Sequence, residues 1–230
     1  MTTARPRETD MAQARLILTM LLVFLPEIGL AGPWPRGEGN QFLSLSIEAE
    51  LENGITSGDE IFTGLFYERG LTPDLTLGFD LGTDPLGESK AFGFLRWPIA
   101  QNDGPNRLAL EVGFGALDGE PAIRPGLSWG RGFDRGDLAG WMSVETRLVL
   151  QEDFDSLLES DFTFGLRPGP RSLVIFQLQT GLPDDDVFFA KIAPSYVQQY
   201  KPGKWFELGL ISGITGVDDF KFKLGLWREF

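Results

Sequence analysis

The chain has 230 residues and a formal net charge of −13, from 20 lysines and arginines against 33 aspartates and glutamates. It contains no cysteine and no histidine, which excludes disulfides, thiolate metal sites and imidazole-based catalysis. The acidic balance argues against a nucleic-acid partner, because phosphate binding requires clustered basic side chains. The 29 glycines and 19 phenylalanines favour strands joined by tight turns.

The first 31 residues have the layout of a secretory signal peptide. Its parts are three arginines, an apolar run and a pair of small residues at the cleavage site: Arg5, Arg7, Arg15, residues 16–25, Gly29 and Ala31. The apolar run is too short to cross a membrane as a helix. Met11 could be the true start, and an amphipathic N-terminal helix is the alternative interpretation. We expect cleavage after Ala31, an irregular periplasmic leader over residues 32–40, and one folded domain over residues 41–230.

Short segments in which apolar and polar residues alternate make up the rest of the chain. The alternation is clearest over residues 43–51, 75–82, 108–116, 158–166 and 220–227. Weaker segments lie near residues 61–68, 91–97, 123–129, 138–150, 172–180, 187–196 and 205–212. A period of two indicates strands with one apolar and one polar face. We predict an all-β, closed antiparallel barrel of about twelve strands, with ten as the alternative count, since each strand and its turn take roughly 16–17 residues.

The end of the chain carries a short motif. Phe230 is the last residue, and apolar residues alternate before it at Leu226, Leu224, Phe222 and Phe220. In this the sequence resembles Gram-negative outer-membrane β-barrels, although Arg228 departs from the pattern. The resemblance implies a transmembrane barrel in the cell outer membrane, in contact with outer-membrane lipids and lipopolysaccharide. It also implies that the barrel-assembly machinery recognises the C-terminal strand.

Aromatic and charged residues sort by strand end. Tryptophans and tyrosines fall near the predicted periplasmic ends: Trp97, Trp129, Trp141, Trp205, Trp227, Tyr67, Tyr196 and Tyr200. Phenylalanines fall toward the outer ends: Phe62, Phe79, Phe92, Phe114, Phe154, Phe188 and Phe220. Acidic residues crowd the predicted outer loops, whereas arginines and lysines occupy the periplasmic turns. Aromatic girdles at both interfaces are typical of a membrane barrel.

The polar face of the strands carries charges of both signs. The candidate lumen residues are Glu48, Glu50, Asp80, Arg96, Glu111, Arg124, Glu145, Arg147, Glu159, Asp161, Lys221 and Lys223. Tight hairpins would place Arg147 opposite Glu159 and Arg96 diagonal to both Asp80 and Glu111. Arg124 would approach Glu145, and Glu145 would lie opposite Asp161. At the closing seam, Glu48 and Glu50 would face Lys221 and Lys223. Opposite charges on neighbouring strands attract, most strongly in a poorly hydrated lumen.

This charged lumen has two interpretations. It could be a narrow pore for small polar solutes or cations, because the acidic side chains are not fully matched by basic ones. It could instead be a packed ion network that fills a structural barrel, since twelve strands lie between filled eight-stranded barrels and open sixteen-stranded porins. A soluble secreted or periplasmic β-barrel or sandwich that binds a ligand is the alternative to both.

Two groups of carboxylates invite a chemical interpretation. The pair Glu145 and Asp161 could perform acid–base work, but nearby arginines favour a structural role. Enzymatic outer-membrane barrels resemble this chain in architecture and depend on a histidine, so no catalytic residue carries over, and we expect no enzyme and no cofactor. The run Asp184, Asp185 and Asp186 is a weak candidate for a divalent cation; such runs more often form a solvated loop.

Overall fold

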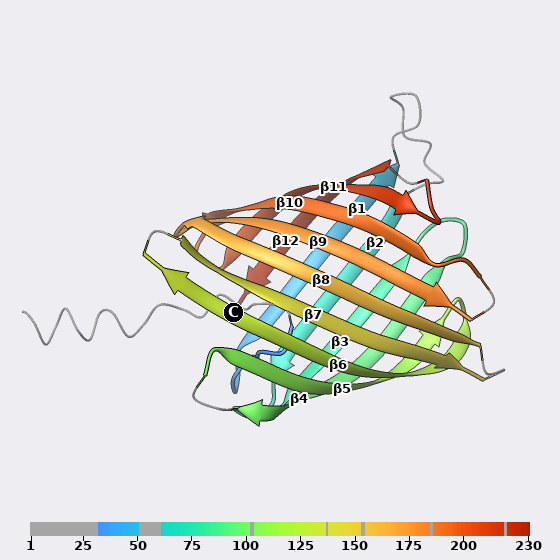
Figure 1. Cartoon of the computed structure of the whole chain (residues 1–230), viewed down its shortest axis with the longest axis horizontal. Coiled ribbons are helices and arrows are strands. Elements are labelled where there is room, and N and C mark those ends of the chain that lie inside the picture. The colour runs from blue at the N-terminus through green and yellow to red at the C-terminus, as the bar shows by residue number, and fades with distance from the viewer. Residues whose placement is uncertain are drawn as a thin grey trace, which may run out of the picture. The chain divides into compact units, whose positions relative to one another are not determined.

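The computed structural model describes residues 32–50, 61–101, 104–136, 138–152, 155–184, 186–218 and 220–230. The expected signal peptide lies outside these residues. The described part forms twelve antiparallel strands that close into one barrel (Figure 1). The strands are β1 (Gln41–Glu50), β2 (Ile61–Gly70), β3 (Thr76–Thr83), β4 (Ser89–Gln101), β5 (Asn106–Leu117), β6 (Glu120–Arg135), β7 (Leu138–Gln151), β8 (Ser156–Gly169), β9 (Ser172–Pro183), β10 (Phe189–Lys201), β11 (Lys204–Thr215) and β12 (Phe220–Glu229).

Every strand pairs with its neighbours in sequence, and β1 pairs with β12 to close the ring. This topology confirms the predicted all-β barrel of about twelve strands. Closure removes the unpaired edges that an open sheet would expose. At the closing seam the pairs include Leu45 with Leu226 and Glu48 with Lys223. The predicted alternation therefore continues across the seam, with apolar residues outside and charged residues inside.

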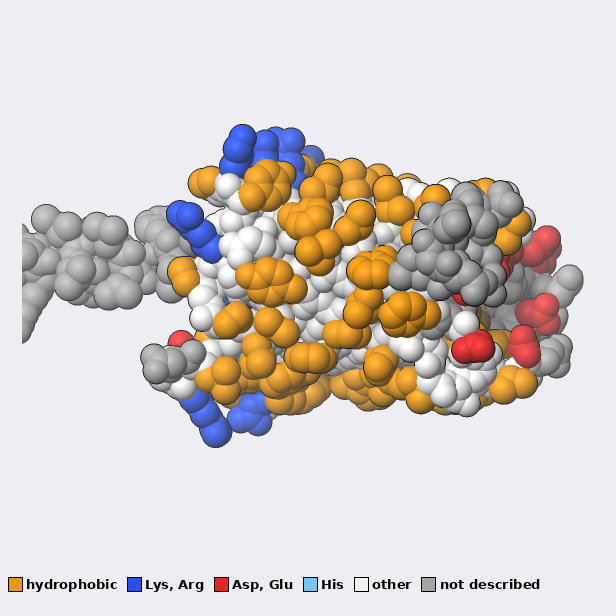
Figure 2. Space-filling model, turned by 90° about the horizontal axis from the view of Figure 1, so that it is seen from above, with side chains coloured by type: hydrophobic (Ala, Val, Ile, Leu, Met, Phe, Trp, Pro, Cys, Tyr) orange, Lys and Arg blue, Asp and Glu red, His pale blue; other side chains and the backbone are white. Residues whose placement is uncertain are grey.

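The outer surface of the barrel carries a broad apolar belt (Figure 2). Leu45 on β1, Leu208 on β11 and Leu224 on β12 are 43, 45 and 47% exposed. Many large hydrophobic residues along the other strands are exposed in the same way. Soluble proteins avoid so extensive an apolar surface, whereas a transmembrane barrel requires one about 25 Å tall. The barrel is therefore built to sit in a membrane, which rules out the soluble β-protein considered above.

Within the described residues, no helix is long and apolar enough to span a membrane.

The predicted aromatic girdle is only partly right. Tyr196 on β10 and Phe114 on β5 are 44% and 65% exposed on the outer surface. In contrast, Trp141 on β7 and Trp205 on β11 are 4% and 1% exposed. Like Phe92 on β4, which is 1% exposed, they share the inward side of their strands with lumen charges. The prediction considered only which end of a strand each aromatic residue is near. It did not consider whether the residue lies on the inward or the outward face of that strand.

The two ends of the barrel differ in charge (Figure 2). One end, which also carries the C-terminus and the turn joining β10 to β11, is basic. The opposite end is acidic, with described side chains that include Asp84, Glu88, Asp118, Glu120, Glu152 and Asp218. By the sequence-based orientation, the basic end is periplasmic and the acidic end is the outer mouth.

Candidate functional site

Ten charged side chains form a connected ion network inside the barrel. Five are acidic and five are basic: Glu68, Asp80, Glu111, Glu145, Asp161, Arg36, Lys90, Arg96, Arg124 and Arg147. They come from strands β2 to β8 and from the segment that precedes β1. Most of these side chains are buried, which is tolerable because each charge has an opposite partner within ion-pair distance. The formal charge of the network is zero.

Arg96 on β4 joins three strands at the centre of this network. Its guanidinium lies 2.7 Å from Glu111 Oε2 on β5, the residue opposite in the ladder, and 2.6 Å from Glu68 Oε1 on β2. Glu145 Oε2 on β7 lies 3.9 Å away. The Arg96 side chain is 3% exposed, so these carboxylates replace its hydration. The planar fork of arginine suits such multiple pairing.

Arg147 on β7 collects a second set of carboxylates. It lies opposite Glu159 in the register, as Glu145 lies opposite Asp161. Its ion pairs join it instead to Glu145 on the same strand at 2.6 Å, to Asp161 diagonally on β8 at 3.1 Å, and to Glu111 on β5 at 3.5 Å. The carboxylates Glu145 and Asp161, considered above for acid–base work, therefore share one arginine. This arrangement is that of a structural ion cluster.

Arg124 on β6 reaches across two strands to Asp80 on β3, at 2.8 Å. Its guanidinium lies over the ring of Phe92, 4.4 Å from the centroid, and Lys90 pairs with the same carboxylate at 2.9 Å. This differs from the expected approach of Arg124 to Glu145 and from a diagonal pairing of Arg96 with Asp80. The expected pairs were based on neighbouring strands only. The Arg124 side chain reaches farther because the ring of Phe92 supports its guanidinium on the way to Asp80.

The segment of residues 32–37 lies inside the barrel against this network. The Arg36 guanidinium donates to Glu68 Oε2, and the Arg36 backbone N–H donates to Thr76 Oγ1 at 3.2 Å. Arg96 donates to the carbonyl of Gly32 at 3.0 Å. Arg36 and Glu68 are lumen residues that were not among those predicted from the sequence. Both faces of β2 carry apolar residues, so its phase was ambiguous, and Arg36 precedes the first strand.

The closing seam brings the remaining predicted charges close together. Glu48 pairs with Lys223, and Glu50 with Lys221, as Cα partners on β1 and β12. The ammonium group of Lys223 lies 3.3 Å from Glu207 Oε1 on β11. The other oxygen of Glu207 accepts a hydrogen bond from Trp227 Nε1 at 3.0 Å. Glu207, which is 3% exposed, is a lumen residue that the sequence analysis missed, because the neighbouring segment was only weakly alternating.

The two sides of the lumen are filled differently. On the side of β2 to β7, inward residues such as Glu68, Arg96 and Phe92 are 1 to 3% exposed. On the opposite side, the small apolar and branched residues Ala193 and Ile211 are buried, but the polar inward residues at mid-height are only half-buried: Glu48, Gln177, Gln179, Lys191 and Ser195. Toward the periplasmic end the same side becomes apolar and buried, at Leu173, Val197 and Trp205. The polar wall opposite the network is therefore less tightly filled at mid-height than toward the periplasm.

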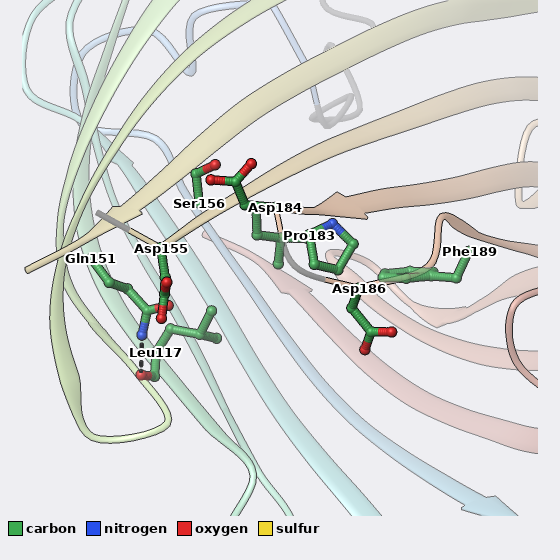
Figure 3. A pocket seen from close by; sticks show the side chains of 9 residues that line it. Leu117, Gln151, Asp155, Ser156, Pro183, Asp184, Asp186 and Phe189 are labelled. Atoms are coloured by element: carbon green, nitrogen blue, oxygen red, sulfur yellow. Dashed lines mark hydrogen bonds between the residues drawn. The ribbon is translucent and has the colours of Figure 1, made fainter. Parts of the chain in front are cut away.

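A pocket of about 350 Å³ lies at the outer mouth of the barrel (Figure 3). It is lined by Leu117, Gln151, Asp155, Ser156, Leu157, Pro183, Asp184, Asp186 and Phe189. Gln151 donates to the carbonyl of Leu117 at 3.2 Å and so links β7 to β5. Below it, Phe92, Ala122 and Val149 form an apolar cluster with Leu117 and Leu157. The mouth therefore has an acidic rim beside a buried apolar cluster.

The aspartate run proposed as a weak cation site lies at this rim. Asp184 and Asp186 line the pocket together with Asp155, and Asp185 lies outside the described residues. The described residues contain no cluster of three acidic side chains suited to hold a metal ion. Among the described residues, the rim is therefore an acidic surface and not a metal site.

No protein-family model and no curated protein sequence matches the chain. Solved structures do match. A KdgM porin superposes with a TM-score of 0.61 and 8% identity, over 82% of this chain and 99% of that one. A NanC porin gives 0.60 and 10%, over 81% and 98%. The COG4313 outer-membrane channel from Pseudomonas putida F1 gives 0.57 and 12%, over 89% and 100%. The TM-scores show a shared closed-barrel fold, and the apolar belt shows independently that this barrel is built to lie in a membrane.

Proposed function

We propose that the protein is a narrow channel for small polar solutes, with a preference for cations. The observation that carries this proposal is the uneven filling of the lumen. Gln177, Gln179 and Ser195 offer amide and hydroxyl groups along a half-buried wall, while the ion network occupies the other side. Such a wall can replace part of the hydration shell of a small polar solute. The solved channels and porins with this fold support the proposal.

The preference for cations has its origin at the outer mouth. The ion network has no formal charge, so it contributes little to the sign of the permeating ion. The rim carries Asp155, Asp184 and Asp186 around the entrance, with further exposed carboxylates on the neighbouring turns. A cluster of one sign at a narrow entrance raises the local concentration of counter-ions.

Planar bilayer recordings test the route through the lumen. Gln177→Trp places a large ring on the polar wall and should reduce or abolish the small conductance of the native barrel. Phe176→Trp is the matched control, because Phe176 is the preceding residue on β9 and is 51% exposed on the outer surface. Equal conductance in the two variants would refute a passage along this wall.

The filled lumen favours a second candidate, a structural barrel that conducts nothing. Native protein that inserts into bilayers but shows no conductance, and no uptake of small sugars by vesicles, would support this second candidate and contradict the channel.

The proposed partners are outer-membrane lipids, lipopolysaccharide and the barrel-assembly machinery. The C-terminal strand presents Phe222, Leu224, Leu226 and Phe230 outward, each 45 to 51% exposed. An alternating apolar strand that ends in phenylalanine suits both lipid contact and recognition during assembly.

A further inference from the structure

The segment of residues 32–37 occupies the lumen without being part of the barrel wall. Pro33 is fully buried and Arg36 is 8% exposed. A methyl group on Gly130 of β6 would lie 2.7 Å from Pro33 Cγ and 2.5 Å from the ring of Trp34. The segment therefore packs directly against a bare stretch of the wall, where only glycine leaves enough room.

Polar contacts fix this segment at both of its ends. At one end Arg36 pairs with Glu68, and its guanidinium lies over Phe42, 4.6 Å from the ring centroid. The Arg36 carbonyl accepts a hydrogen bond from Asn40 at 2.9 Å. At the other end, Arg96 binds the Gly32 carbonyl. Two side chains of the barrel wall, Glu68 and Arg96, thus hold the segment at its two ends, which is more than an untethered leader would need.

Glu145 faces the start of the segment. A Cβ built on Gly32 would lie 3.5 Å from Glu145 Oε1, and 3.4 Å from the Cβ of Ser143. From standard bond lengths, the Gly32 nitrogen then lies within about 6 Å of that oxygen. Glu145 Oε2 already binds Arg147, so Oε1 is the oxygen turned toward Gly32. This separation is within the range at which opposite charges stabilise each other.

The signal sequence predicts cleavage between Ala31 and Gly32. Hydrolysis of that amide by a signal peptidase consumes one water, leaves a carboxylate on Ala31 and releases an amine on Gly32, which is protonated at neutral pH. We propose that residues 32–37 are an intramolecular plug of the channel, bound through Arg36 to Glu68 and through the new ammonium group of Gly32 to Glu145. The part of this proposal that concerns occlusion rests on the proposed channel function; the part that concerns binding does not.

The plug and a group of apolar side chains lie at the same end of the barrel. Leu173, Val197 and Trp205 narrow the polar wall there, and the segment enters the lumen from the same end, since it leads directly into the start of β1. The plug and these three side chains together restrict the passage along the half-buried wall, so the conductance of the native barrel should be small. Release of the segment would widen the passage without altering any strand.

Chemical labelling tests the binding of the plug independently of conductance. The chain has no cysteine, so Pro33→Cys introduces a single thiol at a fully buried position. We expect this thiol to resist a bulky water-soluble maleimide in the folded barrel and to react once Arg36→Glu is added, because two carboxylates would then face each other. Glu38→Cys, at an exposed position, should react in both backgrounds. Rapid labelling of Pro33→Cys in the otherwise native barrel would overturn the plug.

Mass spectrometry and bilayer recordings test the remaining parts. The intact mass of the protein from membranes should correspond to a chain that begins at Gly32; any other first residue overturns the ammonium contact with Glu145. Arg36→Glu should raise conductance at least several-fold, while Arg69→Glu, the same charge change on the outward face of β2, should not. Equal conductance of Arg36→Glu and the native barrel overturns the occlusion. Absence of conductance in every variant, with Pro33→Cys still protected, would instead refute the channel and retain the bound segment.

Discussion

Replacing Glu68 by glutamine should destabilise the barrel more than any change at an exposed carboxylate. The Glu68 side chain is 1% exposed and pairs with both Arg36 and Arg96. The substitution keeps the size of the side chain and removes the charge, so it leaves two buried guanidinium groups with weaker partners. Breaking a buried ion pair by removing one partner costs about 3–5 kcal/mol. Arg96 keeps Glu111 at 2.7 Å, so the loss falls mainly on Arg36.

Urea unfolding in lipid vesicles, followed by the gel-mobility shift of the folded barrel, measures this loss as a change in the free energy of unfolding. Glu88→Gln, at an exposed outer turn, is the matched control and should change it by no more than about 0.5 kcal/mol. The double variant Glu68→Gln with Arg36→Gln should recover part of the loss, because one buried charge disappears with its partner. A loss below about 1 kcal/mol for Glu68→Gln alone would refute the idea that this buried pair holds the network together.

Two further predictions concern the outside and the inside of the wall. Leu208 faces the lipid near the middle of β11 and is 45% exposed, so Leu208→Arg should cost about 2–4 kcal/mol of folding free energy in vesicles. The control Leu86→Arg, at an outer-turn position that is 73% exposed, should cost little. Similar costs for the two variants would contradict the membrane placement of β11. Phe92→Ala, inside the lumen at 1% exposure, should destabilise by about 3–5 kcal/mol because it empties the apolar cluster and removes the ring beneath Arg124. Thermal unfolding of Phe92→Ala, compared with that of Phe114→Ala on the outer surface, measures this loss of stability. If Phe92→Ala loses less stability than Phe114→Ala, the cluster does not support the network.

The phase of most strands could be predicted from the sequence, because one face is uniformly apolar. On β1, β5 and β12, strict alternation identified the outward residues correctly, and tight hairpins placed Arg147 opposite Glu159 on β7 and β8. The phase of β2 could not be predicted, since Phe62 and Phe66 share the inward face with Glu68. A lipid-facing strand must be apolar outside, but nothing requires it to be polar inside.

The contacts that cross the lumen were beyond prediction for a different reason. Arg124 meets Asp80 although two strands lie between them, and Arg36 meets Glu68 from a segment outside every strand. Such pairs depend on barrel curvature and on which rings support the long side chains. The spacing of residues along the sequence gives neither the curvature of the barrel nor the positions of these rings.

Three of the connections at the outer mouth are short, and this has a consequence for how the barrel meets its surroundings. Between described strands they span five residues from β3 to β4, two from β5 to β6 and four from β7 to β8. The two-residue turn is formed by Asp118 and Gly119, both at positive φ, which is the tightest hairpin closure available to a barrel. Loops of this length scarcely rise above the strand ends. On these sides the mouth would lie close to the membrane surface and offer little for a large ligand such as an antibody to bind, so selection among solutes in the proposed channel would depend on the rim and the lumen and not on long loops.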